Sequence, residues 1–510
     1  MRRARTKLFC LALTALLAVS LTYLPAKAAD AGNPLVVVQG VDAETLDPAM
    51  SVTITNMNYS YNLYDPLVNR NSKLELIPGL AEEWKALDNN TWEFKLRKGV
   101  KFHNGEDFKA DAVIFSWKRI YAEGSKSPQK GWFSSIKDIQ ALDDYTIQIK
   151  TSDPDPIMPA RMTMLFMVPP KYVQEVGGTQ FNLKPVGTGP FKFSKWTKND
   201  SVVFEANADY WQGAPVVGKV IFKVMPETQA RVSALRAGEA DIIVNVPPDQ
   251  IPAIEGTTGC TLKSTPSSRV LWVQLVANRD SSPFKDKRVR QAVSYGVNVS
   301  EILEYVVQGY GTQISTILSP LIFGYDASIP PYEYNPEKAK QLLAEAGYPN
   351  GFSVKFDSPN GRYTLDREVA QAIAGQLAKV GVKVDLRLQE WATYSTMFSN
   401  HKIADMWMLG WSLPMLDPDA WMWPLFHSGE PLSNWDNAEF NQVVEAARRE
   451  MDTAKRAELY GKAQKILKEE APMIFLYQLK DLYGASSRVD WNPRPDESIR
   501  FYEVKWATGK

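Results

Sequence analysis

Two neighbouring acids come closest to the spacing of a catalytic pair. Asp417 and Asp419 are two positions apart, and paired carboxylates can act as general acid and base in a secreted hydrolase. Asp417 also precedes Pro418, and a carboxylate in that position commonly caps the free N–H groups at the start of a helix. Hydrolysis and capping therefore both remain open for this pair, and we favour capping.

Other catalytic and metal-binding patterns are incomplete. His103, His401 and His427 are isolated from one another and have no CxxC motif nearby, so we expect no metal site. Ser127 and Lys130 have the S-x-x-K spacing of β-lactamases, but the partner motifs of those enzymes are missing. We therefore expect no cofactor and no enzymatic activity.

The N-terminus has the three parts of a secretory signal. Basic residues from Arg2 to Lys7 precede an apolar run from Leu8 to Leu21, and Ala26-Lys27-Ala28 places small residues where a signal peptidase cuts. The apolar run is shorter than the roughly 20 residues that span a bilayer. We predict a signal peptide over residues 1–28, cleaved near Ala28-Ala29, and an exported, soluble protein.

Charge and size narrow the class of protein further. Loss of the predicted signal removes five basic residues, which leaves 53 basic against 58 acidic residues and argues against nucleic acid as a partner. Cys260 is then the only cysteine, so no internal disulfide can form. About 480 residues are too many for one hydrophobic core, so we expect two or three domains.

Hydrophobic periodicity predicts a mixed α/β protein. Apolar residues alternate with polar ones over 92–96, 146–150 and 220–224, as in half-buried strands. A helix is predicted over 366–379, and an alternating strand follows at once over 382–389. A helix followed directly by such a strand is a common α/β packing unit.

Five segments in a fixed order carry a resemblance to a known family. They are Tyr64-Asp65-Pro66-Leu67, residues 78–84 (PGLAEEW), residues 94–105 (FKLRKGVKFHNG), residues 186–191 (VGTGPF) and residues 284–292 (FKDKRVRQA). Behind a signal peptide, they are similar to the family 5 extracellular solute-binding proteins, which serve dipeptide, oligopeptide, glutathione and nickel ABC transporters. The resemblance covers essentially the whole mature chain.

The resemblance implies an α/β, two-lobed periplasmic-binding-protein fold of class II type, with an inserted extra subdomain and hinge-connected lobes around a ligand cleft. The implied domains are lobe I at 29–58, 186–278 and 481–510, its inserted subdomain at 59–185, and lobe II at 279–480. The hinge is expected near Ala277-Asn278 and near Lys480.

The resemblance also implies partners and a location. It implies a periplasmic monomer that captures a peptide or peptide-like solute and delivers it to the permease and ATPase subunits of an ABC transporter. A non-peptide solute, such as a sugar, an opine or a metal chelate, is the alternative.

The family's ligand contacts carry over only in part. In dipeptide and oligopeptide members, an aspartate three residues after a Gly-Trp pair holds the ligand's amino terminus; here that pair is Gly410-Trp411, and Pro414 occupies the position. An unpaired ammonium in a dry cleft is costly, which argues against a simple dipeptide. Arg362 is similar to the arginine that holds the ligand carboxylate, although a solvated loop arginine is equally open. The full set of predicted cleft residues is Trp411, Ser412, Leu413, Pro414, Arg362, Tyr363, Trp391, Asp417, Thr53 and Asn56.

Overall fold

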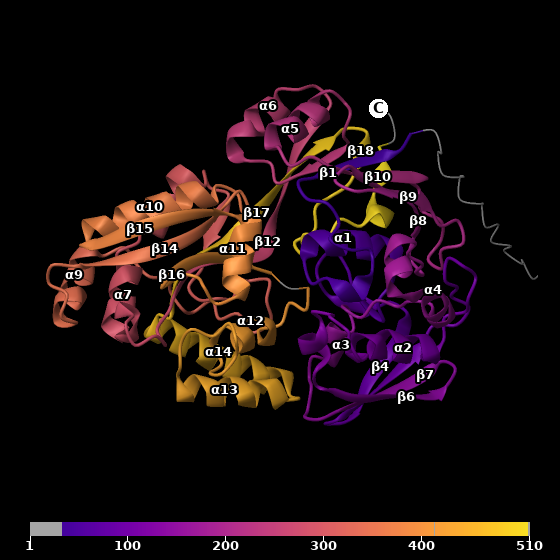
Figure 1. Cartoon of the computed structure of the whole chain (residues 1–510), viewed down its shortest axis with the longest axis horizontal. Coiled ribbons are helices and arrows are strands. Elements are labelled where there is room, and N and C mark those ends of the chain that lie inside the picture. Colours follow the sequence, from indigo (N-terminus) through magenta and orange to yellow (C-terminus); the bar gives the residue numbers. More distant parts are fainter. Residues whose placement is uncertain (1–32, 413, 508–510) are drawn as a thin grey trace, which may run out of the picture.

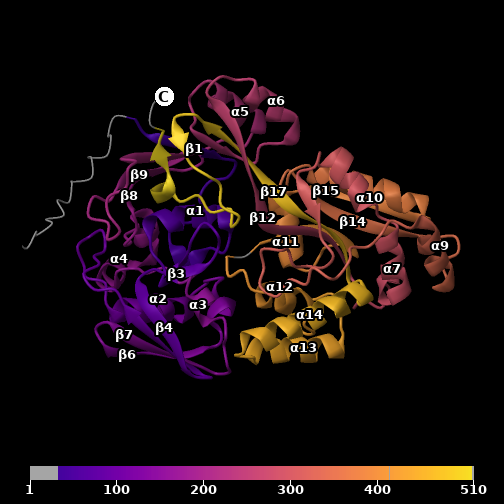
Figure 2. The same ribbon diagram turned by 180° about the vertical axis from the view of Figure 1, so that it is seen from behind.

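Two long strands join two lobes that lie side by side (Figures 1 and 2). The computed structural model describes residues 33–412 and 414–507, so the predicted signal peptide over residues 1–28 lies outside the described residues. The connecting strands are β12 (Cys260–Leu275) and β17 (Met473–Ser486). None of the helices in these ranges is long and apolar enough to span a bilayer.

One eleven-stranded sheet extends through both lobes. Its order is β15-β14-β16-β12-β17-β11-β1-β10-β9-β8, and β13 pairs with β17 beside this path. The remaining strands of the sheet are β1 (Leu35–Gln39), β8 (Phe191–Thr197), β9 (Ser201–Ala206), β10 (Lys219–Val224), β11 (Ile242–Val244), β13 (Gly311–Gln313), β14 (Phe352–Asn360), β15 (Val382–Glu390) and β16 (Met406–Trp411). The lobes thus share hydrogen-bonded backbone at their junction.

The chain passes between the lobes where the pairing of β12 with β17 is interrupted. The register shifts between Pro266 and Val270; before the shift Pro266 pairs with Lys480, and after it Val270 pairs with Gln478. From Val270 onward β12 also pairs with β16 of the second lobe, whereas β17 pairs with β11 of the first lobe beyond Lys480.

The sequence predicted hinges near Ala277-Asn278 and near Lys480, whereas the change in strand pairing lies between Pro266 and Val270 of β12 and between Gln478 and Lys480 of β17. Residues 267–277 are all buried, so no change in hydrophobic pattern marks the point at which the strand leaves one lobe for the other. Residues 270–275 belong to the sheet of the second lobe and were assigned to lobe I by the sequence.

The inserted subdomain lies beside the first lobe and has its own sheet, ordered β4-β5-β7-β6. The predicted strand over 92–96 is confirmed, because Trp92, Phe94 and Leu96 point into the core. The elements are β2 (Val68–Arg70), β3 (Leu76–Pro78), β4 (Ala81–Asp88), β5 (Thr91–Leu96), β6 (Ile136–Asp143), β7 (Thr146–Thr151), α2 (Ala110–Tyr121), α3 (Met158–Arg161) and α4 (Pro170–Leu183).

Helices complete both lobes. In the first lobe these are α1 (Ile54–Leu63), α5 (Thr228–Arg236) and α6 (Ile251–Glu255). In the second lobe they include α7 (Lys287–Tyr295), α9 (Pro336–Glu345), α10 (Asp366–Lys379), α11 (Trp391–Ser399), α12 (Asp419–Phe426), α13 (Ala438–Arg449) and α14 (Thr453–Glu470). The predicted helix over 366–379 and the strand after it are confirmed as α10 and β15.

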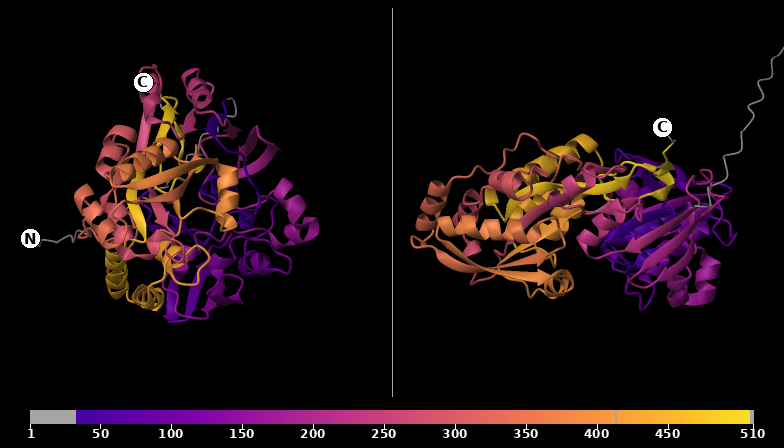
Figure 3. Two further views of the ribbon diagram at one scale, coloured as in Figure 1. Left: turned by 60° about the vertical axis from the view of Figure 1, so that its left-hand side comes forward. Right: turned by 90° about the horizontal axis from the view of Figure 1, so that it is seen from above.

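The C-terminal segment returns to the first lobe after β17. Its strands β18 (Val489–Asp490) and β19 (Lys505–Trp506) pair with each other, and the ring of Phe501 packs against Phe204 and Phe222 of the first-lobe core. Seen from above, the lobes occupy opposite ends of the long axis and the connecting strands run between them (Figure 3). The position of this segment brings its residues to the junction of the lobes.

Candidate functional site

A cavity at the crossing of β12 and β17 is lined from both lobes. The first lobe contributes Thr55 and Asn58 of α1, and the second contributes Arg362 from the loop between β14 and α10. Asp481 of β17 and Glu497 of the C-terminal segment line it as well. A molecule bound in this cavity would contact both lobes at once.

The loop that carries Arg362 is held by its own backbone contacts. The carboxylate of Asp366 accepts hydrogen bonds from the N–H groups of Gly361, Arg362 and Tyr363, at 2.9, 2.8 and 3.0 Å. Gly361 has a φ of +84°, a conformation that glycine adopts without strain. The loop therefore presents Arg362 from a fixed backbone.

The guanidinium of Arg362 lies between aromatic rings without an anionic partner. Its Cζ is 5.2 Å from the centre of the Tyr363 ring and 5.1 Å from that of Trp391. Burial, and next the nearby charge of Arg269, lower the pKa of Arg362. Within residues 33–412 and 414–507, no carboxylate forms an ion pair with this guanidinium. A planar, partly dehydrated cation of this kind is well suited to receive a carboxylate.

Arg269 connects the C-terminal segment to the second lobe. Its Nη2 is 2.9 Å from Oε2 of Glu497, and its Nη1 donates to the carbonyl of Gly410 in β16, at 3.2 Å. The hydroxyl of Tyr363 donates to the same carbonyl, at 3.0 Å. Burial alone would lower the pKa of Arg269, but the negative charge of Glu497 raises it above its usual value. Arg269 is thus already paired, unlike Arg362.

The side chains of Tyr363 and Arg269 pack closely against Gly410 and leave no room for a side chain at this position. A Cβ at this position would lie 2.8 Å from Cε1 of Tyr363 and 3.2 Å from Cδ of Arg269. Because both side chains would have to move, we expect Gly410→Ala to lower the free energy of unfolding by about 1–3 kcal/mol. Gly375→Ala in α10 is the matched control, since a Cβ there meets no atom within 4 Å. Urea denaturation of both variants measures the difference, and equal midpoints would contradict the prediction.

Two predicted cleft residues at the start of α1 have other contacts. The hydroxyl of Thr53 donates to Glu44 at 3.0 Å, and Oδ1 of Asn56 accepts from the N–H groups of Glu44 and Thr45 at 2.9 and 3.2 Å. The helix turns Ile54, Thr55 and Asn58 toward the cavity instead. Thr53 and Asn56 thus fasten the preceding loop and do not line the cavity, because Thr53 precedes the helix and the side chain of Asn56 lies on another helix face than those of Ile54 and Asn58.

Trp411, Ser412 and Pro414 do not line the cavity and make other contacts. Trp411 donates from Nε1 to the carbonyl of Ala420 at 3.2 Å, and the hydroxyl of Ser412 is 2.5 Å from that of Ser268. The carbonyl of Pro414 accepts from Nε of Arg70 in β2, at 3.1 Å. Leu413, also predicted, lies outside the described residues. The position that holds an aspartate in dipeptide members thus contributes an interlobe contact here.

Asp417 and Asp419 are paired with arginines. Oδ2 and Oδ1 of Asp417 accept from Nη1 and Nη2 of Arg456 at 2.7 and 2.6 Å, and Oδ1 also accepts from the N–H of Asp419 at 3.0 Å. Asp419 is 3.2 Å from Arg161 and 2.8 Å from Arg448. Asp417 therefore replaces its predicted cleft role with a structural one at the start of α12, and neither acid lines the cavity.

The two predicted aromatic residues lie next to Arg362. Tyr363 lines the cavity directly. Trp391 is in contact with the guanidinium of Arg362 but is not among the residues that line the cavity. Its ring stacks on that of Tyr394, with centres 5.9 Å apart and planes at 21°.

Sequence reasoning missed Arg269, Asp481 and Glu497. Asp481 offered a signal, because it is an acid within the apolar strand 473–486. Glu497 offered none, because it lies in an irregular segment with no periodic pattern, where its backbone has a left-handed φ of +59°. Such left-handed residues cluster at functional sites.

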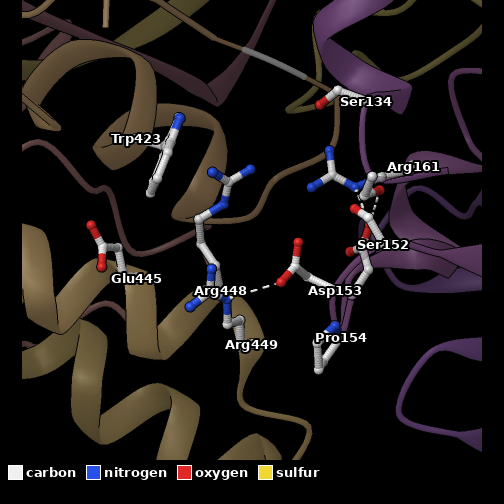
Figure 4. Close-up of a pocket in the computed structure, with 11 residues that line it drawn as sticks. Ser134, Ser152, Asp153, Pro154, Arg161, Trp423, Glu445, Arg448 and Arg449 are labelled. Carbon is white, nitrogen blue, oxygen red and sulfur yellow. Dashed lines mark hydrogen bonds and ion pairs between the residues drawn. The ribbon is translucent and has the colours of Figure 1, made fainter. Parts of the chain in front are cut away.

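A second pocket lies farther from the crossing, between the inserted subdomain and α13 (Figure 4). Arginines and acids face one another across it: Arg449 is 3.5 Å from Asp153, and Arg161 bridges Asp155 at 2.8 Å and Asp419 at 3.2 Å. The pairs Arg449–Asp153 and Arg161–Asp419, together with the contact of Arg70 with Pro414, connect the inserted subdomain to the second lobe.

Two lobes joined by paired strands, with a polar cavity between them, define a two-lobed binding protein. Residues 75–432 match the family model described as "Bacterial extracellular solute-binding proteins, family 5 Middle". The chain belongs to this family.

Curated relatives and solved structures agree with that assignment. The chain is 30% identical to Di/tripeptide-binding protein 1 of Pseudomonas aeruginosa, over 84% of this chain and 85% of that protein. It is 31% identical to Heme-binding protein A of Haemophilus influenzae, over 84% of each chain. Its fold is similar to that of the ABC transporter-associated periplasmic binding protein DppA of Helicobacter pylori in complex with the peptide STSA, with a TM-score of 0.83, 28% identity and coverage of 93% and 98%.

Proposed function

We propose that this protein is the substrate-binding subunit of an ABC importer, and that it captures a peptide or peptide-like solute in the periplasm. The similarity to Di/tripeptide-binding protein 1 of Pseudomonas aeruginosa supports the class of solute. The similarity to the ABC transporter-associated periplasmic binding protein DppA of Helicobacter pylori supports both the transporter and the compartment. The protein acts without catalysis, as a monomer, and presents its closed form to a membrane permease whose ATPase subunit supplies the energy.

The observation that carries this proposal is the unpaired guanidinium of Arg362 in the interlobe cavity. A free carboxylate is common to peptides and to many peptide-like solutes, and an arginine fork binds it with two parallel hydrogen bonds. Such a solute would also contact α1 of the first lobe, so it would favour the closed arrangement. The population of closed molecules then rises according to how much more tightly the solute binds the closed form than the open form.

Native mass spectrometry of freshly purified protein tests the proposal directly. We expect an added mass that corresponds to a small carboxylate-bearing solute and disappears after partial denaturation and refolding. Thermal denaturation of the refolded protein with di-alanine, tri-alanine and glutathione should then show stabilisation. A solute at about 100 times its Kd adds about 2.7 kcal/mol to the free energy of unfolding. Absence of stabilisation by every carboxylate-bearing compound would contradict the proposal, as would turnover of any of them.

A further inference from the structure

Asp481 is an acidic residue in the same cavity as Arg362, and it forms no ion pair with any described residue. It lies on β17 just beyond the crossing, on the side of the first lobe, where β17 pairs with Thr265 of β12. Its Oδ2 atom is buried and has no hydrogen-bond partner among the described residues. A buried carboxylate oxygen without a donor is costly unless something supplies one.

The neighbouring charged groups do not supply that donor. Arg269 of β12 is engaged with Glu497 and with the carbonyl of Gly410. The hydroxyl of Ser267, also on β12, donates to Oε1 of Glu497 at 3.1 Å, and it is close enough to Asp481 to lower the pKa of that carboxyl group through a hydrogen bond. Tyr483, two residues along β17, lines the cavity and donates no hydrogen bond to Oδ2 of Asp481. Oδ2 of Asp481 therefore remains available to a bound molecule.

The two unpaired groups come from different lobes and have complementary chemistry. Arg362 of the second lobe can donate to an anion, and Asp481 of the first can accept from a cation. A molecule that carries both an ammonium group and a carboxylate would satisfy both groups, and it would tie the lobes together.

We infer that Asp481 is the anchor for the ammonium group of a zwitterionic solute whose carboxylate binds Arg362. This inference rests on the proposed function and adds that the solute carries a free amine. It also gives the amine a partner that does not depend on position 414, whose carbonyl is bound by Arg70.

Binding of an ammonium group beside Asp481 should release a proton, and this release can be measured. Burial, and next the negative charge of Glu497, raise the pKa of Asp481 to about 8. At pH 7 a substantial share of the empty molecules therefore carries Asp481 in its protonated form. An ammonium group beside it favours the carboxylate form, so binding should release a proton. The same compound with an acetylated amine should release none.

Calorimetry with matched compounds tests the inference. Di-alanine, tri-alanine and glutathione would each be titrated beside their N-acetylated forms, at pH 7 in phosphate and in Tris, whose different ionisation enthalpies reveal proton release. We expect at least one free-amine compound to bind about ten-fold or more tightly than its acetylated form. Asp481→Asn should remove that preference, because the amide cannot carry the negative charge. Asp490→Asn, at an exposed position of β18 in the same part of the chain, is the matched control and should behave like the wild type.

The possible failures are distinguishable. Equal affinity for acetylated and free compounds, no proton release by the wild type, or an unchanged preference in Asp481→Asn would overturn the inference and leave a carboxylate-binding protein. Failure of every carboxylate-bearing compound to bind would overturn the proposed function and the inference together. The proton-release measurement uses only the wild type, so the inference stays testable even if Asp481→Asn does not fold.

Discussion

Replacing Arg362 by alanine is expected to weaken the binding of carboxylate-bearing solutes by about 2–5 kcal/mol, which is at least about thirty-fold in Kd. The reason is that the solute carboxylate would enter a cavity from which water is largely displaced and find no cation to pair with. The empty protein should keep its stability, because the guanidinium has no carboxylate partner within the described part of the chain whose loss could be felt.

The control for this prediction is Arg367→Ala on the neighbouring helix α10. Arg367 is an exposed residue that pairs with Glu368 at 2.6 Å and does not line the cavity. Isothermal titration with tri-alanine or glutathione should show normal affinity for this variant. Equal affinities for Arg362→Ala and the wild type would show that another group binds the carboxylate.

Replacing Arg456 by methionine is expected to lower the free energy of unfolding by about 3–5 kcal/mol. Arg456 and Asp417 are both buried and are joined by two hydrogen bonds, so the substitution leaves a buried carboxylate without its cation. Methionine keeps much of the volume of the arginine stem, so most of the loss comes from the unpaired charge. Chemical denaturation followed by circular dichroism measures the change.

Two further variants separate charge from packing in this prediction. Lys455→Met changes the exposed residue next in the chain and should leave the denaturation midpoint almost unchanged. The double variant Asp417→Asn with Arg456→Met removes both charges and should recover part of the stability. If the double variant is as unstable as Arg456→Met, lost packing and not an unpaired charge is the cause.

The regular elements of the second lobe were predictable because each has a strong local pattern. The apolar period over 366–379 and the alternation over 382–389 correspond to α10 and β15. The first crossing between the lobes was not predictable in this way, since residues 267–277 are buried throughout and carry no periodic signal.

The cavity itself was predictable only where one short segment contributes to it. The resemblance led to Arg362 and Tyr363, which follow one another in a loop and both line the cavity. It could not lead to Asp481, because the pairing of β17 with β12 is a long-range feature. It could not lead to Glu497 either, because that residue lies in an irregular segment far from the rest of the cavity in the sequence. At the start of α1, the predicted residues Thr53 and Asn56 lie only one or two positions along the chain from Thr55 and Asn58, which line the cavity.

The return of the C-terminal segment to the first lobe has a consequence for synthesis. The cavity needs Gln39 from the first strand and Glu497 from the last described loop. Domains generally fold as units, with the N-terminal domain first during synthesis. Here the first lobe emerges in part before the second, and must wait for residues beyond 480 before its sheet and the cavity are complete. A chain that stalls or is cut before that point lacks both Asp481 and Glu497, so an unfinished copy cannot compete for solute with finished ones.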